Sequence, residues 1–308
     1  MRHLNSSPLH VNFAGLSLAN PTMLASGILG LSAESIGLLV EKGAGAIVTK
    51  SIGIKPRKGY PNPTVVQVGD SIVNAIGLPN PGITGFIDEL RMMKRFGVPV
   101  IVSVYGFSVE EYIEVAEIAV EAGADAVELN VSCPHVKQTG LEIGQKLEVL
   151  ADVVHGVKAA VKKPVFAKLS PNVTDIAEYA EAVADAGADA VTATNTVRAM
   201  AIDVEAGIPI LSNRIGGLSG PSVKPIAVRC VYEIYERVEL PIIGCGGIVN
   251  WCDAVEFILA GASAIQIGTA VSTKGPDIFS SIAHGVDNYL KSKGFRNIGE
   301  IVGLSHRK

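Results

Sequence analysis

The chain has 308 residues, of which 48% are hydrophobic and 18% are charged, so it can bury a large core. A formal net charge of −4 without basic runs predicts no nucleic-acid partner, and the sequence has no apolar stretch long enough to span a membrane. Residues 1–8 carry no signal-peptide pattern, and the four cysteines show neither a Cys-x-x-Cys pair nor a zinc-type spacing. We therefore expect a cytoplasmic protein with reduced thiols and no bound metal.

Two strand signatures alternate along the chain. A proline before an apolar run alternates strictly with Gly-Ala-x-Ala before another run, which gives eight short strands. In chain order they begin at Pro21, Gly43, Pro99, Gly123, Pro164, Gly187, Pro241 and Gly261. The glycine suits the position just after a helix, and the windows Val109 to Glu121 and Thr174 to Asp185 have helical periodicity. The pattern predicts a (β/α)8 barrel in one domain spanning residues 1–308, rather than an open doubly wound sheet.

Two further features lie outside this alternation. Residues 9–18 alternate apolar and polar side chains around Gly15, which predicts a hairpin over the N-terminal end of the barrel. Long connections follow three strands: residues 51–98 after the second, about 14 residues after Asn130, and about 28 residues after Thr194. Barrel active sites lie at the carboxyl ends of strands, so these connections after strands two, four and six are expected to form a lid. A disordered insertion is the alternative.

A thiol near one strand end is the first candidate for chemistry. The fourth predicted strand ends at Asn130, and Cys133 follows it by three residues, between a serine and a proline. On a partly solvated loop, a thiol can ionise and act as a base or nucleophile. The alternative is a small buried hydrophobic residue, which is the usual role of a lone cysteine.

Glycine-rich turns end the last two predicted strands, at Gly246–Gly247 and Gly268–Thr269. In barrels, the loops after strands seven and eight commonly bind phosphate through backbone N–H groups. Residues 216–220 offer a further glycine-rich backbone surface. Any one of these glycines alone is best explained by an ordinary tight turn. Two consecutive strands that end in this way favour a phosphate-bearing ligand.

Amines and amides occur at the other strand ends. Lys50 and Lys168 end apolar strands, where an amine can neutralise a phosphate, form a Schiff base or stabilise a developing anion. The side-chain amides of Asn74, Asn130 and Asn195 donate and accept hydrogen bonds in one plane, which suits a planar imide such as a pyrimidine. A local Asx-turn is the alternative for each asparagine taken singly.

These residues belong to a set of motifs in which the chain resembles the cysteine-dependent, cytosolic class 1 dihydroorotate dehydrogenases, and most closely the NAD-linked type. The resemblance extends from Ala25 to Ala270. Its most specific motifs are Asn62-Pro-Thr, Asn74-Ala-Ile-Gly-Leu-Pro-Asn-Pro-Gly82, Asn130-Val-Ser-Cys-Pro, Lys168-Leu-Ser-Pro, Thr194-Asn-Thr196, Gly217-Leu-Ser-Gly-Pro-Ser-Val-Lys-Pro and Gly244-Cys-Gly-Gly-Ile248.

The resemblance implies a bound FMN and the oxidation of dihydroorotate to orotate in pyrimidine biosynthesis. It implies that Cys133 removes the C5 proton while hydride leaves C6 for the flavin. The implied substrate contacts are Lys50, Asn74, Ala75, Ile76, Gly77, Leu78, Asn130, Asn195 and Thr196. The implied FMN contacts are Ser26, Lys50, Ser51, Ser103, Asn130, Lys168, Thr194, Gly220, Gly246, Gly247, Gly268 and Thr269.

Two positions depart from the family pattern. The family usually reads Asn-Val-x-Gly where this chain has Ser103-Val-Tyr-Gly106, and asparagine where it has His135. His135 either caps its loop or raises the thiolate population of Cys133. Cys-Pro-His also occurs in dihydropyrimidine dehydrogenases, which are the nearest alternative. A further alternative is a flavin-free, phosphate-binding aldolase or isomerase in which Lys50 or Lys168 is the reactive amine.

The destination of the electrons lies outside this sequence. The chain has no cluster-type cysteine spacing and no second nucleotide-binding fold. The resemblance therefore implies a partner subunit that carries FAD and a 2Fe-2S cluster and reduces NAD, either in a heterotetramer or around a homodimer core. A homodimer that uses fumarate is the alternative.

Overall fold

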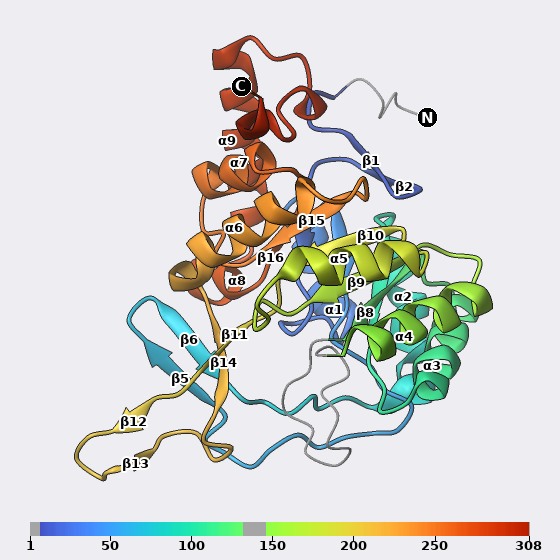
Figure 1. Ribbon diagram of the computed structural model, residues 1–308, viewed down its shortest axis with the longest axis vertical. Helices are drawn as coiled ribbons and strands as arrows, with labels where there is room; N and C mark the ends of the chain where they lie inside the picture. The colour runs from blue at the N-terminus through green and yellow to red at the C-terminus, as the bar shows by residue number, and fades with distance from the viewer. Residues whose placement is uncertain (1–6, 132–145, 308) are drawn as a thin grey trace.

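A closed barrel of eight parallel strands forms the centre of the computed structural model, which describes residues 7–131 and 146–307 (Figure 1). The neighbouring strands run β10-β15-β16-β3-β4-β7-β8-β9 and then close. The barrel strands are β3 (Thr22–Leu24), β4 (Ala46–Val48), β7 (Val100–Val104), β8 (Ala126–Asn130), β9 (Val165–Leu169), β10 (Ala190–Ala193), β15 (Ile242–Cys245) and β16 (Ala262–Ile267). All eight lie where the two signatures predict strands, so the predicted barrel is confirmed.

The barrel strands are apolar because both of their faces are covered. Every residue of β7, β8 and β9 is buried, as expected for parallel strands enclosed by helices. The glycines that open the second signature each follow a helix and have positive φ, between 93° and 124°. Each therefore ends a helix and turns the chain into the next strand, as the signature predicts.

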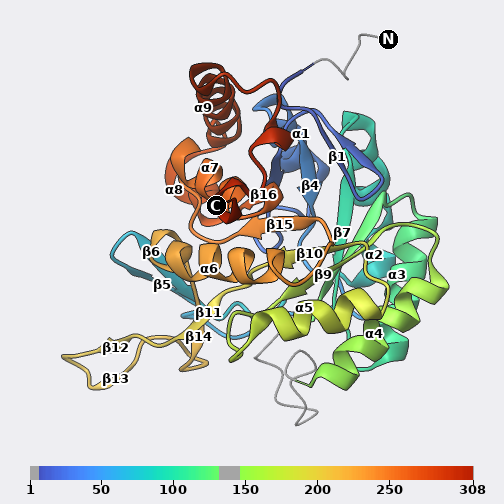
Figure 2. The same cartoon turned by 45° about the horizontal axis from the view of Figure 1, so that its top comes forward.

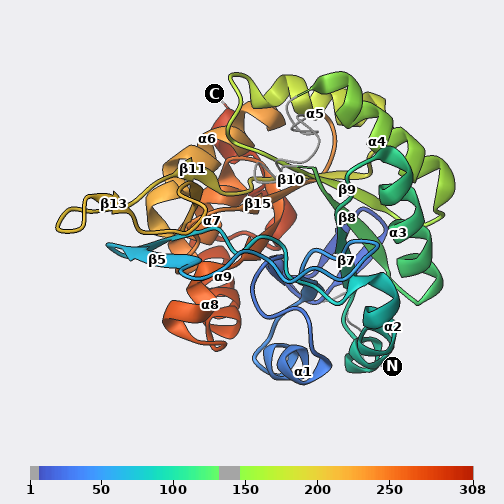
Figure 3. The ribbon, with the colours of Figure 1, turned by 90° about the horizontal axis from the view of Figure 1, so that it is seen from below.

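Helices surround the barrel, and Figure 3 shows α2 to α6 in an arc outside β7 to β10 and β15. The helix α3 has the bounds of the predicted window, and Ser108 caps its N-terminus. At the N-terminus of α7, Asn250 and Asp253 form a capping box. The helices are α1 (Ala33–Glu41), α2 (Gly82–Met93), α3 (Val109–Glu121), α4 (Leu147–Ala160), α5 (Ile176–Asp185), α6 (Lys224–Tyr235), α7 (Trp251–Leu259), α8 (Thr269–Lys274) and α9 (Ile278–Lys293). Short 3-10 helices are η2 (Lys94–Phe96), η4 (Pro221–Val223), η5 (Ile298–Glu300) and η6 (Leu304–His306). Within the described ranges, none of the helices is both long and apolar enough to cross a membrane.

The predicted hairpin is present as β1 (Val11–Phe13) paired with β2 (Leu16–Leu18). Its inward side chains are buried, and the Phe13 ring packs edge-to-face on Phe166 with centroids 5.5 Å apart. Phe166 lies near the start of β9, so the hairpin covers the N-terminal end of the barrel. The hairpin and the β5–β6 pair lie at opposite ends of the molecule (Figure 1, Figure 2).

The long connections after β4 and β10 join in one antiparallel sheet, ordered β11-β14-β6-β5. Residues 51–98 supply β5 (Val65–Val68) and β6 (Ser71–Asn74) before α2, and the connection after β10 supplies β11 (Val197–Ala199) and β14 (Gly216–Ser219). A second hairpin, β12 (Ile202–Asp203) with β13 (Ile208–Pro209), projects from this sheet (Figure 1). The sequence predicts long connections at these strands but not that two of them pair. Most of the connection after β8 lies outside the described residues.

Candidate active site

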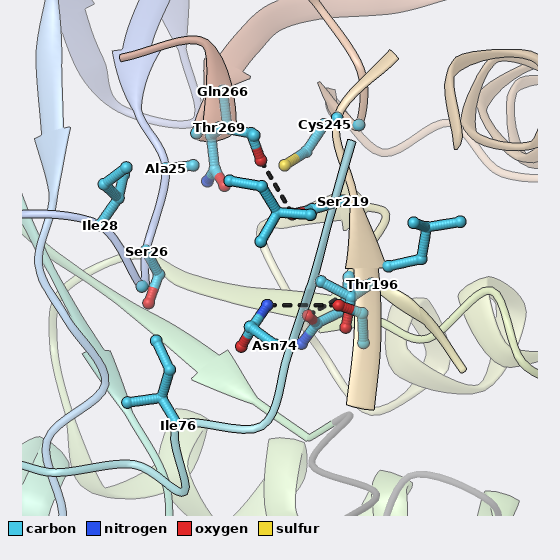
Figure 4. Close-up of a pocket in the computed structure, with 18 of the residues that line it drawn as sticks. Ala25, Ser26, Ile28, Asn74, Ile76, Thr196, Ser219, Cys245, Gln266 and Thr269 are labelled. Atoms are coloured by element: carbon cyan, nitrogen blue, oxygen red, sulfur yellow. Dashed lines mark hydrogen bonds between the residues drawn. The ribbon is translucent and has the colours of Figure 1, made fainter. Parts of the chain in front are cut away.

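A cavity of about 460 Å³ opens at the carboxyl ends of the barrel strands, between them and the β6–β14 pair. Figure 4 shows Ser26, Asn74, Thr196, Cys245 and Gln266 arranged around it. Except for Ser103, every substrate or cofactor contact implied by the resemblance and lying within the described chain lines this cavity. Cys133 and His135 lie outside the described residues, so their predicted roles remain predictions.

Ser51 is the centre of a row of hydrogen bonds that joins neighbouring strand ends. The Asn130 side-chain amide donates to the Ser51 hydroxyl over 2.9 Å, and the Asn195 side-chain amide donates to the side-chain oxygen (Oδ1) of Asn130 over 3.2 Å. The Ser26 and Ser51 hydroxyls are 3.2 Å apart. These bonds hold Asn130 with its amide group at the cavity wall, and its side chain cannot rotate without breaking two of them.

Ser103 lies one layer deeper than predicted. It is fully buried and does not line the cavity, and its hydroxyl is 2.9 Å from that of Ser51. The Ser103 hydroxyl thus meets Ser51 and not the cavity. In this structure, Ser103 therefore supports Ser51, and a direct contact of Ser103 with a cofactor stays untested.

Lys168 lies in the cavity floor and is almost completely buried. Its ammonium donates to the Gln266 side-chain oxygen over 2.7 Å and is 3.8 Å from both the Glu128 carboxylate and the Cys245 sulfur. Burial lowers the pKa of Lys168, but Cys245 and Glu128 raise it, and the net shift is upward. Because burial also raises the pKa of the Cys245 thiol, that thiol is uncharged at neutral pH. The Glu128 carboxylate, 3.8 Å away, contributes to keeping Lys168 as an ammonium.

Lys50 has the opposite electrostatic environment. Burial lowers the pKa of its ammonium, because the folded chain withdraws the side chain from water without supplying an anion of comparable effect. A ligand carboxylate or phosphate would restore this missing interaction. Lys50 is therefore suited to bind an anionic group.

The predicted substrate segment, residues 74–78, follows β6 along the cavity edge. The Asn74 amide donates to the Gly217 carbonyl oxygen over 3.3 Å, so β14 orients it. The segment then turns through Gly77 and Leu78, which have φ values of 80° and 57°. A positive φ is uncommon for leucine, so surrounding contacts must hold this turn.

Three glycines from two segments meet at the opposite corner. Gly220 lies just before η4, and Gly246 and Gly247 follow β15. A Cβ atom on Gly247 would lie 2.9 Å from the Gly220 carbonyl oxygen, and one on Gly246 would lie 2.8 Å from the Ala227 methyl group. Only glycine fits these positions, and the backbone is left open toward the cavity. Nearby, Thr269 donates a 2.8 Å hydrogen bond to the Ser219 hydroxyl.

The sequence analysis missed Gln266, Cys245 and Ser219, all of which line the cavity. Gln266 had a local sequence signal, since it is a long polar side chain between Ile265 and Ile267 in β16. Cys245 lies inside a quoted motif but was not assigned a role. Ser219 also lies inside a quoted motif, but its place in the cavity wall depends on the pairing of β14 with β6.

A parallel barrel with an enclosed cavity at its strand ends, lined by buried amines, amides and glycine turns, defines a barrel enzyme. The dihydroorotate dehydrogenase family matches residues 8–290 of this chain. The chain therefore belongs to the dihydroorotate dehydrogenase family.

Individual relatives agree over nearly the full length. The chain is 53% identical over 297 residues to the protein named dihydroorotate dehydrogenase B (NAD(+)), catalytic subunit, of Pyrococcus abyssi, covering 96% of this chain and 99% of that protein. It is 52% identical to the protein of the same name from Thermococcus kodakarensis, covering 96% of this chain and 98% of that protein. It is 50% identical to the protein of the same name from Methanocella arvoryzae, covering 96% of this chain and 97% of that protein. The family resemblance seen in the motifs is thus confirmed.

Proposed function

We propose that this chain is the catalytic subunit of an NAD-linked dihydroorotate dehydrogenase, acting in the cytoplasm in pyrimidine biosynthesis. The reaction oxidises dihydroorotate to orotate by loss of a hydride from C6 and a proton from C5. Family membership across residues 8–290, together with relatives of that name at 50–53% identity, carries the proposal. The chain is accordingly an oxidoreductase that acts on a CH–CH bond.

The residues of the cavity fit FMN. Gly220, Gly246 and Gly247 line the cavity at positions where an added Cβ would collide with the protein, and such a glycine-rich backbone suits a phosphate group. The remaining proposed contacts are Ser26, Lys50, Ser51, Asn130, Lys168, Thr194, Gly268 and Thr269. FMN supplies the acceptor for the hydride when it is bound. The protein positions it and, through the Lys168 ammonium, favours negative charge at the cavity floor.

Dihydroorotate presents a carboxylate and a ring with alternating N–H and C=O groups. The amides of Asn74, Asn130 and Asn195 offer donors and acceptors for that ring, and the Lys50 ammonium suits the carboxylate. Residues 75–78 and Thr196 complete the proposed contacts. Both Asn130 and Asn74 are held by protein hydrogen bonds, so the substrate meets groups that are already oriented.

Cys133 is the proposed base that takes the C5 proton. It follows β8 by three residues, and β8 ends at Asn130 in the cavity wall. Cys133 itself lies outside the described residues, so its role rests on the family resemblance and its place in the sequence.

A partner subunit is proposed as the route for the electrons. The relatives named above are catalytic subunits of NAD(+) enzymes, which implies a second kind of subunit. We expect that partner to carry FAD and a 2Fe-2S cluster, either in a heterotetramer or around a homodimer core. Purification from the native host should recover both subunits together, and a chain that always runs alone would contradict this part of the proposal.

Anaerobic reduction tests the central proposal. Dihydroorotate is added to the purified, FMN-loaded chain without oxygen, and the flavin absorption is followed. Rapid bleaching is the expected result and would establish the cofactor, the substrate and the half-reaction together. A yellow protein that dihydroorotate does not bleach would favour a dihydropyrimidine substrate instead. A chain that cannot be loaded with FMN would point to a flavin-free barrel.

A further inference from the structure

A layer of polar side chains crosses the barrel interior at the floor of the cavity. Lys168 on β9 and Gln266 on β16 line the cavity. Glu128 lies on β8 two residues before Asn130, one step deeper on the same face of the strand. Thr192 lies on β10, and its hydroxyl reaches Glu128. Branched apolar residues usually fill such interiors. A buried carboxylate at this depth therefore needs a specific reason.

One oxygen of Glu128 is fully engaged and the other is not. Its Oε2 accepts hydrogen bonds from the Thr192 hydroxyl over 2.9 Å and from the Gln266 amide over 2.5 Å. Its Oε1 is buried, accepts no hydrogen bond from any described residue, and is 3.8 Å from the Lys168 nitrogen. The carboxylate thus directs its uncommitted oxygen at the ammonium, while Gln266 bridges the two groups through its own oxygen.

This arrangement matters because both charges are out of water. The side chains of Lys168 and Glu128 are 6% and 0% exposed, and an isolated buried charge is so costly that the group becomes neutral instead. Among the described residues, Glu128 and Cys245 are the titratable groups that act on Lys168. The thiol is neutral near pH 7 because burial raises its pKa. The nearby Glu128 carboxylate therefore offsets part of the cost of burying the positive charge of Lys168.

We infer that Glu128 is a positioning residue of the cofactor site, which, with Gln266 as a bridge, holds Lys168 in place as an ammonium facing the flavin. The inference rests on the proposed FMN site. Glu128 does not line the cavity, so it acts through Lys168 and not by contact. Lys168 then presents a positive charge that is constant across the working pH range.

The test compares Glu128→Gln with Thr192→Val. Glu128→Gln removes the carboxylate charge and nearly keeps the shape of the side chain. Thr192→Val removes the hydrogen bond from Thr192 to Glu128 but keeps the Glu128 charge. The FMN dissociation constant of each full-length chain is measured between pH 6 and pH 10. We expect Glu128→Gln to bind FMN about tenfold more weakly, or ~1.4 kcal/mol, with its affinity falling at lower pH than in the wild type. Thr192→Val should keep the wild-type pH profile.

The same substitution in a Lys168→Met variant distinguishes this role from a purely structural one. In Lys168→Met, the added Glu128→Gln change should leave the pH profile of FMN binding unaltered, because no amine remains to lose its proton. An equal loss of affinity from Glu128→Gln in both backgrounds would overturn the inference. So would a Glu128→Gln profile that superimposes on that of the wild type.

A readout without FMN keeps the inference distinct from the proposed function. Competitive acylation of lysines in the FMN-free chain, followed by mass spectrometry, reports the pKa of Lys168 directly. Glu128→Gln should increase the labelling of Lys168 at pH 8 about tenfold relative to the wild type, because loss of the carboxylate lowers the pKa of the Lys168 amine. Unchanged labelling would refute the inference. Failure of the wild-type chain to bind FMN would refute the proposed function, and labelling would still decide whether Glu128 controls the charge of Lys168.

Discussion

The side-chain amide of Asn80 donates a 2.9 Å hydrogen bond to the carbonyl oxygen of Leu78, the last residue of the proposed substrate segment. The same side chain donates to the Tyr105 hydroxyl over 2.8 Å and accepts from the backbone N–H groups of Gly53 and Gly82 over 3.3 and 2.9 Å. Asn80 is buried and does not line the cavity. It therefore joins the substrate segment to the segment after Lys50, to the start of α2 and to the end of β7.

Replacement of Asn80 by alanine should loosen residues 74–78. Leu78 would keep its unfavourable φ of 57° with one contact fewer to hold it. We expect the KM for dihydroorotate to rise about tenfold, as for the loss of roughly 1–1.5 kcal/mol of hydrogen bonding, with a smaller change in kcat and FMN retained. Steady-state kinetics check this. Asn12→Ala, an exposed site on the opposite hairpin, is the matched control, and an unchanged KM in Asn80→Ala would contradict the role.

Replacement of Cys133 by alanine should remove the base without removing the cofactor. A positioned base typically contributes about 10²–10⁴-fold to rate, so turnover should fall by that order while FMN stays bound. Stopped-flow reduction by dihydroorotate measures the effect on the flavin half-reaction. Cys252→Ala changes an exposed cysteine and should leave the rate unchanged. Near-normal turnover in Cys133→Ala would show that another group takes the proton.

Replacement of Gly247 by alanine should close the proposed phosphate corner. Its φ is 77°, and an added Cβ would lie 2.9 Å from both the Gly220 carbonyl oxygen and the Lys224 backbone nitrogen. We expect FMN to bind at least about tenfold more weakly, because the turn must shift to relieve strain of roughly 1–2 kcal/mol. Gly97→Ala is a close control, since Gly97 has a φ of 74° with open space around its Cβ position. That variant should lose stability but not FMN, and equal FMN affinity in both variants would argue against the corner.

Lys50 should make the FMN-free protein less stable at neutral pH. Burial lowers its pKa in the folded state, so the unfolded chain binds more protons between that lowered value and the usual 10.5. The free energy of unfolding therefore rises with pH through this window, and the penalty is fully present below it. Lys50→Met should be more stable than the wild type at pH 7, with the difference shrinking toward pH 10, and it should bind dihydroorotate poorly.

Urea unfolding at the two pH values measures this effect. Lys55→Met is the control, because Lys55 is an exposed lysine in the same connection. It should show no such pH-dependent difference. A Lys50→Met variant that is less stable than the wild type at pH 7 would mean that Lys50 makes a favourable interaction in the fold that outweighs its burial.

The barrel could be predicted from the sequence because its signals are local. A strand covered on both faces is mostly apolar along its length, and a helix that turns sharply into a strand favours glycine at the turn. These two requirements recur in chain order, as at Gly123 before β8 and Gly187 before β10. The strand ends follow from the same pattern, so local sequence signals suffice to place Lys50, Asn130 and Lys168 at one end of the barrel.

The supports of the site could not be predicted, because they depend on contacts between distant segments. The orientation of Asn74 follows from β6 pairing with β14, about 140 residues away in the chain. Ser103 lies beneath Ser51 because of the lateral register of β4 and β7. Glu128 meets Lys168 and Gln266 only when the barrel closes. The sequence alone thus determined the barrel, its carboxyl-end site and its family, through local patterns. Only the tertiary structure decided which buried partners orient and charge that site, because those partners meet through barrel closure and strand register.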